Sequence, residues 1–185
     1  RREIERILKT VLTANGDIGF LQDMAVLGSV YGFVDCIVRP GEGIFSGAGQ
    51  GSGFTSATRP TANFDSVSAN ASRIDLELVE APRALPVLDE NDYRRIKHYI
   101  QHFCKLTNSV SGEGGFLSRL LGRGGGSEKR RTVSVTEVIG PDLWQRYENR
   151  ELAAEGVNPL GQVPVVHIQN VAQPYFYEGL SDVEQ

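Results

Sequence analysis

The residues best suited by type to chemistry are the histidines and cysteines, and His98, His102 and Cys104 lie close together in the sequence. Two histidines four residues apart share one face of a helix, where both rings can bind one metal ion, and His167 could supply a third ligand. The metalloprotease form of this spacing needs a glutamate directly after the first histidine, and Tyr99 stands there. We interpret these histidines as packed or surface residues, and predict no metal site, no catalytic site and no cofactor.

Two glycine-rich stretches, residues 41–72 and 109–131, invite a phosphate-binding interpretation. The run that begins at Gly122 lacks an adjacent Gly-Lys-Ser/Thr, and residues 47–53 complete no Gly-x-Gly-x-x-Gly frame. Gly51-Ser52-Gly53 also fails the Gly-x-Ser-x-Gly pattern of a hydrolase nucleophile. Such a composition buries too little side-chain surface to offset its ordering entropy, so we predict two long flexible loops.

A basic cluster occupies the second stretch. Its members are Arg119, Arg123, Lys129, Arg130 and Arg131. On a loop they could contact the DNA backbone without sequence preference. The formal net charge of -4 argues against a general nucleic-acid-binding module, so a solvated loop or a subunit contact is the preferred interpretation.

Helical spacing of apolar residues indicates which elements must position these groups. Residues 4–12 and 17–31 form the first two predicted helices, separated by the helix stop Asn15-Gly16 and the N-cap Asp17. A third helix is predicted over residues 88–103, because acidic residues fill its first turn.

Alternation of apolar and polar residues predicts strands. These cover residues 33–38, 74–78, 132–138 and 165–168, with an extended link at 80–86 and a short helix or aromatic-rich turn at 141–147. The predicted fold class is α+β: mixed helices packed on a small, mostly antiparallel sheet, in a single domain over residues 1–185 with two long glycine-rich loops. No apolar run approaches the roughly 18 residues of a membrane span. Cys36 and Cys104 are expected to be reduced and mostly buried.

The most specific pattern lies near the C-terminal end of the sequence. It reads Asn158-Pro159-Leu160-Gly161-Gln162-Val163-Pro164-Val165-Val166-His167-Ile168-Gln169-Asn170, followed by Gly179-Leu180-Ser181-Asp182. Asn158-Pro159 begins a turn, Gly161 supplies a permissive backbone, and Pro164 suits the first residue or the edge of a strand. We therefore interpret this closing motif as architectural. Its marked positions are Asn158, Gly161, Pro164, Val165, Asn170, Ser181 and Asp182.

The closing motif resembles the Asn-x-x-Gly-x-x-Pro-Val-Val-x-x-x-Asn, then Gly-x-Ser-Asp, pattern of portal proteins from tailed bacteriophages and prophages. Further blocks occur in the matching order, at residues 17–38, 74–89 and 133–147. The resemblance implies the wing part of a portal subunit. The sequence begins without Met and ends at what reads as a helix start, so we expect a piece of a longer protein, without its stem, clip and crown.

The resemblance implies a structural function and no enzymatic activity. Portal subunits form a homo-oligomeric, dodecamer-like ring at one capsid vertex, through which double-stranded DNA passes without sequence preference. Terminase, scaffold or capsid proteins and head-tail connector proteins are the implied partners, with no membrane. The implied location is the virion, after assembly in the host bacterial cytoplasm. Two alternatives remain open: a phage-associated adaptor or scaffold-binding module, and a metal hydrolase that uses His98, His102 and His167.

Overall fold

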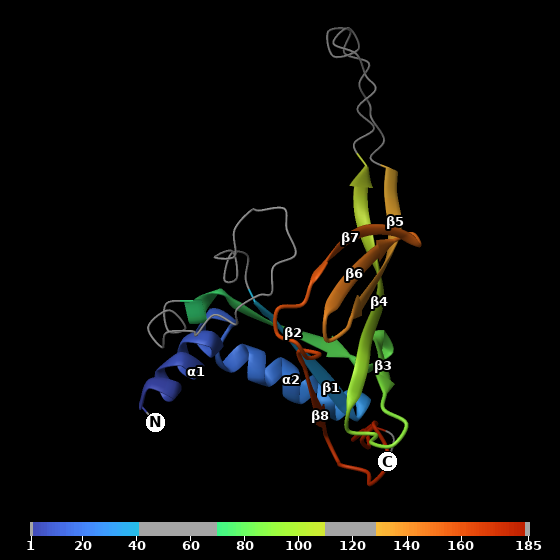
Figure 1. The fold of residues 1–185 in the computed structure, drawn as a ribbon. Helices are drawn as coiled ribbons and strands as arrows, with labels where there is room; N and C mark the ends of the chain where they lie inside the picture. The colour runs from blue at the N-terminus through green and yellow to red at the C-terminus, as the bar shows by residue number, and fades with distance from the viewer. Residues whose placement is uncertain (1, 41–69, 110–128, 184–185) are drawn as a thin grey trace, which may run out of the picture.

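The computed structural model describes residues 2–40, 70–109 and 129–183 (Figure 1). Its elements are α1 (Arg2–Ala14), α2 (Ile18–Tyr31), β1 (Phe33–Pro40), η1 (Ala71–Arg73), β2 (Ile74–Glu80), η2 (Ala81–Arg83), β3 (Ala84–Leu88), β4 (Ile96–Ser109), β5 (Lys129–Ile139), β6 (Leu143–Glu148), β7 (Glu151–Val157) and β8 (Val165–Gln169). The fold is α+β with antiparallel sheets, as the sequence predicts. Most of both glycine-rich stretches lies outside the described residues, so their expected flexibility stays a prediction.

Helix α1 ends as its sequence predicts. Gly16 has a φ of 96°, which suits glycine, and its N–H donates to the carbonyl oxygen of Thr13. The N–H of Asp17 donates to the carbonyl oxygen of Leu12 over 2.8 Å, which completes a Schellman motif. Asp17 stands at the N-cap position of α2, as predicted, but its side chain makes no cap hydrogen bond, and its N–H closes the first helix.

The strands form a three-stranded sheet of order β2-β1-β8 and a five-stranded sheet of order β3-β4-β5-β6-β7, and all their pairs are antiparallel. Strand β1 is the centre of the smaller sheet and is buried over its first five residues. Phe33 and Ile37 of β1 pack against Tyr99 and Ile139 of the larger sheet, so the core lies between the two sheets. Helix α2 contacts β1 and β2, and forms a third layer.

The predicted third helix, residues 88–103, is wrong. Strands β3 and β4 form a hairpin there, and Asp89 and Asp92 accept backbone N–H bonds from Asn91 and Arg94 in its turn. Aspartate serves turns as well as helix starts, because its carboxylate can accept backbone N–H groups in both. The acidic residues therefore mark the hairpin turn and not a helix cap.

Other boundaries also differ from expectation. Residues 143–148 form strand β6 in place of a helix or turn, the link at 80–86 contains η2 and most of β3, and β7 has no predicted counterpart. Cys36 is buried as expected, whereas Cys104 is exposed. The predicted strands at 33–38, 74–78, 132–138 and 165–168 are all present, with longer bounds in each case.

Large apolar side chains remain exposed on both helices. On α1, Ile4 and Leu8 are 57% and 63% exposed, and on α2 Val26 is 60% exposed. Helix α2 is apolar on most sides, yet Gly28 is its only buried residue. A helix of this composition is normally covered on more than one face. Neither described helix has the length and apolar character needed to cross a membrane.

Candidate functional site

The carboxylate of Asp35, on β1, is fully buried. The hydroxyl of Tyr99 donates to Oδ2 over 2.8 Å, and the hydroxyl of Tyr177 donates to Oδ1 over 2.9 Å. Nδ1 of His167, on β8, lies 2.7 Å from Oδ1. The three donors come from β4, β8 and the C-terminal segment, so the Asp35 cluster ties these three parts to β1.

Both ring nitrogens of His167 face acceptors. Besides the contact of Nδ1 with Asp35, Nε2 lies 2.6 Å from the backbone carbonyl oxygen of Tyr177. A carbonyl oxygen cannot donate, so Nε2 is the donor in this contact, and Nδ1 is engaged by the carboxylate of Asp35. The ring also stacks on Tyr177 with centroids 3.7 Å apart. No ring nitrogen is left to take a proton from a substrate.

Burial holds the two tyrosines of the Asp35 cluster in their neutral form. It raises the pKa of Tyr99 and of Tyr177 far above the usual range, and the negative charge of Asp35 raises both further. Burial, followed by the charge of Asp35, also raises the pKa of the Cys36 thiol. The neutral hydroxyls can therefore keep donating to the carboxylate.

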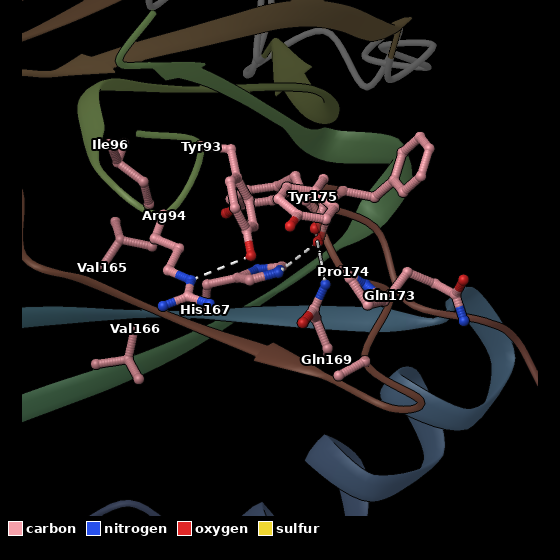
Figure 2. Close-up of a pocket in the computed structure, with 13 residues that line it drawn as sticks. Tyr93, Arg94, Ile96, Val165, Val166, His167, Gln169, Gln173, Pro174 and Tyr175 are labelled. Atoms are coloured by element: carbon pink, nitrogen blue, oxygen red, sulfur yellow. Dashed lines mark hydrogen bonds between the residues drawn. The ribbon is translucent and has the colours of Figure 1, made fainter. Parts of the chain in front are cut away.

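A groove of about 760 Å³ runs beside the Asp35 cluster (Figure 2). Its walls are β8, the turn between β3 and β4, and residues 172–177. Tyr175 and Phe176 are 82% and 66% exposed, and Nε of Arg94 donates to the hydroxyl of Tyr93 over 3.1 Å. That bond lowers the pKa of Tyr93. The groove thus combines a strand, aromatic rings and a cation.

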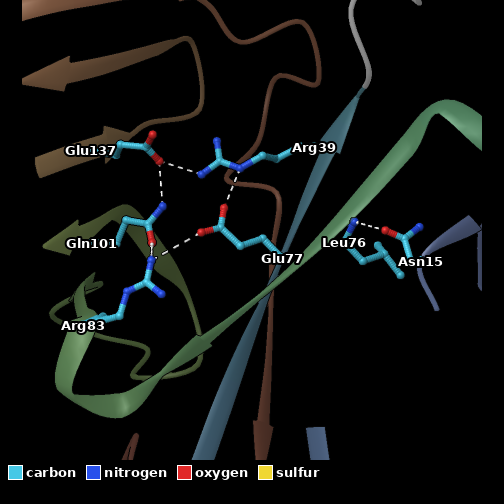
Figure 3. A network of polar contacts seen from close by, with 7 residues as sticks. All are labelled: Asn15, Arg39, Leu76, Glu77, Arg83, Gln101 and Glu137. Atoms are coloured by element: carbon cyan, nitrogen blue, oxygen red, sulfur yellow. Dashed lines mark hydrogen bonds and ion pairs between the residues drawn. The ribbon is translucent and has the colours of Figure 1, made fainter. Parts of the chain in front are cut away.

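A second polar cluster connects the two sheets (Figure 3). Arg39 on β1 pairs with Glu77 over 2.7 Å and with Glu137 on β5 over 2.5 Å. Gln101 donates to Glu137 over 2.6 Å, and Arg83 donates to Gln101 over 3.2 Å. The arginine and both glutamates are partly exposed, in contrast to Asp35. We call these five residues the Arg39 cluster.

The first half of the closing motif forms a turn anchored to the larger sheet. Asn158 is 7% exposed, its amide donates to the carbonyl oxygens of Gly140 and Gln162 over 2.8 Å each, and its Oδ1 accepts the N–H of Leu160. Gly161 has a φ of 65°, a conformation that favours glycine. Pro164 directly precedes the edge strand β8, which begins at Val165, as the motif predicts.

The second half of the motif fastens the C-terminal segment to the end of α2. Asn170 donates to Leu180 and to Asp182, and the hydroxyl of Ser181 donates to the carbonyl oxygen of Val30 over 2.7 Å. Nearby, a Cβ on either Gly32 or Gly179 would lie 2.3 Å from the carbonyl oxygen of the other. Two chain segments therefore cross at a distance that only glycine permits.

The histidines of the candidate metal site are not brought together. His98 and His102 lie on β4, where four residues span about 13 Å, too far apart for one zinc ion. His102 contacts Thr136 instead, and His167 is engaged with Asp35. The described residues contain no cluster of three or more His, Cys, Asp or Glu that could hold a metal ion.

The basic cluster is only partly visible. Arg119 and Arg123 lie outside the described residues, whereas Lys129, Arg130 and Arg131 begin β5 and not a loop. Arg131 is exposed. A contact of this cluster with DNA or a neighbouring subunit stays a prediction.

The sequence interpretation missed Asp35, Tyr99 and Tyr177 as a unit. One signal was present: Asp35 is the only charged residue in the apolar run 33–38, and a buried carboxylate needs partners. The identity of those partners depends on strand pairing between segments that are far apart in sequence.

Comparison with known proteins adds no relative. No protein-family model matches the chain, and no curated protein matches it.

Proposed function

We propose that the protein is a structural subunit of a ring-shaped portal at a phage capsid vertex, a channel for DNA and a docking platform for terminase and connector proteins. The observation that carries the proposal is the closing motif, which resembles that of portal proteins. Its polar residues Asn158, Asn170 and Ser181 all serve as backbone anchors. An architectural motif fits an architectural function.

Exposed apolar surface supports self-association. Ile4 and Leu8 of α1, and Ile18 and Val26 of α2, are each more than half exposed. Soluble monomers rarely leave large contiguous apolar areas uncovered, and such areas often mark subunit contacts. A subunit within a ring would cover them.

The links between the two sheets also suit a ring that bears load. The Asp35 cluster and the Arg39 cluster both join the smaller sheet to the larger one. Two separate polar links resist sliding of one sheet over the other.

The geometry does not favour the hydrolase alternative. His98 and His102 project from separate positions of a strand, and both nitrogens of His167 are occupied. A general base needs a free nitrogen within reach of the substrate proton. The adaptor alternative predicts the same fold with a monomeric or dimeric protein.

Native mass spectrometry with negative-stain images of the full-length protein tests the proposal. Closed rings with a central hole wide enough for a DNA duplex are expected. A monodisperse monomer or dimer that forms no ring at high concentration would overturn the portal proposal and favour the adaptor module. Zinc bound by the purified protein, and lost in His98→Ala, would revive the hydrolase.

A further inference from the structure

We propose that the outer edge of β7 in one copy of the chain pairs with the outer edge of β8 in the next copy. Such pairing would continue the sheets from subunit to subunit. The inference rests on the proposed ring, and it names the surfaces through which neighbouring subunits meet.

Two of the four sheet edges in the described part of the chain are protected. Asn15 shields the edge of β2, because its amide donates to the carbonyl oxygen of Ile74 and accepts the N–H of Leu76 over 2.7 Å (Figure 3). Strand β3 carries Pro86 at its centre, and proline has no N–H to offer another strand. Both are recognised ways of preventing strand addition.

The edge of β8 is open and faces the groove. The N–H of Val38 donates to Pro164 and that of Asn170 donates to Gly32, so even-numbered residues of β8 bond to β1. Alternation then turns the backbone N–H and C=O of His167 and Gln169 away from β1, toward the groove. This side of β8 pairs with no described strand.

The edge of β7 is open and exposed. Asn158 donates its N–H to Asp142, so the same alternation turns the backbone groups of Glu155 and Val157 outward. Leu152 is 50% exposed and Val157 is 76% exposed. All but one of the seven residues of β7 are exposed.

The charges of the two edges are complementary. Glu151 and Glu155 of β7 are exposed carboxylates, and repulsion between like charges opposes pairing of β7 with another β7. Arg94 lines the groove beside β8, and Arg94 and Arg95 line an adjoining cavity of about 600 Å³, in which Lys97 forms an ion pair with Asp89. A strand bearing glutamates therefore fits beside β8 better than beside its own copy.

Pairing of β7 with β8 joins two different surfaces, and this allows a ring to form. An interface of this type is heterologous, so each copy keeps one edge available after the first contact. Repetition closes a ring when the rotation per subunit divides a full turn. An isologous pairing of identical edges would stop at a dimer.

Charge reversal in the full-length protein tests the pairing. Glu151→Lys with Glu155→Lys should abolish rings and leave folded monomers, because cationic edges then meet. Arg94→Glu with Arg95→Glu should do the same. An equimolar mixture of the two variants should restore rings of alternating subunits, since each mixed contact is again complementary.

Asp75→Lys with Asp142→Lys is the matched control: it makes the same charge change at two exposed carboxylates outside both edges and should leave rings intact.

A backbone variant tests strand pairing separately from charge. Val157→Pro removes an outward N–H of β7 and should abolish rings, whereas Val157→Ala keeps that N–H and should preserve them. Circular dichroism and thermal unfolding establish that each variant is folded.

The outcomes separate this inference from the proposed ring. Rings in both charge-reversed variants and in Val157→Pro would overturn the edge pairing and leave the portal proposal standing. Failure of the mixture to restore rings would also overturn it. Absence of rings in the unaltered protein would contradict the portal proposal itself.

Discussion

The two polar clusters that join the sheets differ in their exposure to solvent. In the Asp35 cluster, one fully buried carboxylate collects two tyrosine hydroxyls and a histidine. In the Arg39 cluster, charged side chains that are partly exposed share their bonds around two glutamates. A buried charge that loses a partner has no water to replace it, whereas an exposed one has. The first cluster should therefore govern whether the sheets associate, and the second should adjust how firmly.

Removal of the buried carboxylate should have the largest effect. Asp35→Ala leaves the hydroxyls of Tyr99 and Tyr177 and one nitrogen of His167 without an acceptor, and should lower the free energy of unfolding by about 3–5 kcal/mol. Urea unfolding followed by circular dichroism measures it. Asp75→Ala, at an exposed carboxylate, is the control and should change it by less than about 0.5 kcal/mol. An equal effect of both changes would show that burial of the Asp35 carboxylate adds nothing to the free energy of unfolding.

The second-largest effect on the free energy of unfolding is expected at alkaline pH, which should weaken the Asp35 cluster. In the unfolded chain Tyr99 and Tyr177 ionise near pH 10, whereas in the fold their pKa values are raised, so their contribution is present below pH 10 and is lost as pH rises above it. Each tyrosine should reduce the free energy of unfolding by about 1.4 kcal/mol per pH unit in that range. Between pH 8 and 11 the free energy of unfolding should decline less steeply in the double variant, Tyr99→Phe together with Tyr177→Phe, than in the unaltered protein. Identical slopes would mean that these hydroxyls ionise alike in both states.

Replacement of Arg39, the central cation of its cluster, should have a smaller effect on the free energy of unfolding. Arg39→Met removes the bonds to Glu77 and Glu137, and should cost about 1–2 kcal/mol at low salt. The difference from the unaltered protein should shrink in 1 M salt, because salt screens exposed charges. If Arg39→Met lowers the free energy of unfolding equally at low and high salt, the Arg39 cluster behaves as a buried cluster.

The smallest effect is expected at the exposed histidines of β4. His98→Ala and His102→Ala should each change the free energy of unfolding by less than about 0.5 kcal/mol. His167→Ala, made for contrast, should cost several times more because it leaves the carboxylate of Asp35 short of a donor. Comparable losses at all three positions would contradict the placement of these side chains.

Segments whose patterns are local were predictable from the sequence. The end of α1 at Asn15-Gly16 follows from the conformational freedom of glycine, and the strands at 33–38 and 165–168 follow from runs of β-branched residues. Pro164 was correctly placed before an edge strand. In each case neighbouring residues alone decide the structure.

Segments decided by distant contacts were not predictable. Ile96, Ile100 and Phe103 fit a helical stripe, but pairing with β3 and β5 draws residues 96–109 into a strand. Strand β7 contains Ala, Glu and Gly, which have low strand propensity, and it exists because β6 lies beside it. The Asp35 cluster was missed for the same reason.

The Asp35 cluster also implies an order of events during synthesis. The partners of Asp35 lie 64, 132 and 142 residues further along the chain. While the chain emerges from the ribosome, Tyr99 is the first partner of Asp35 to be made, and the carboxylate lacks its other two partners until the segment from His167 to Tyr177 has followed. The smaller sheet can close only late, and ribosome-bound chains that stop before His167 should remain open to proteases.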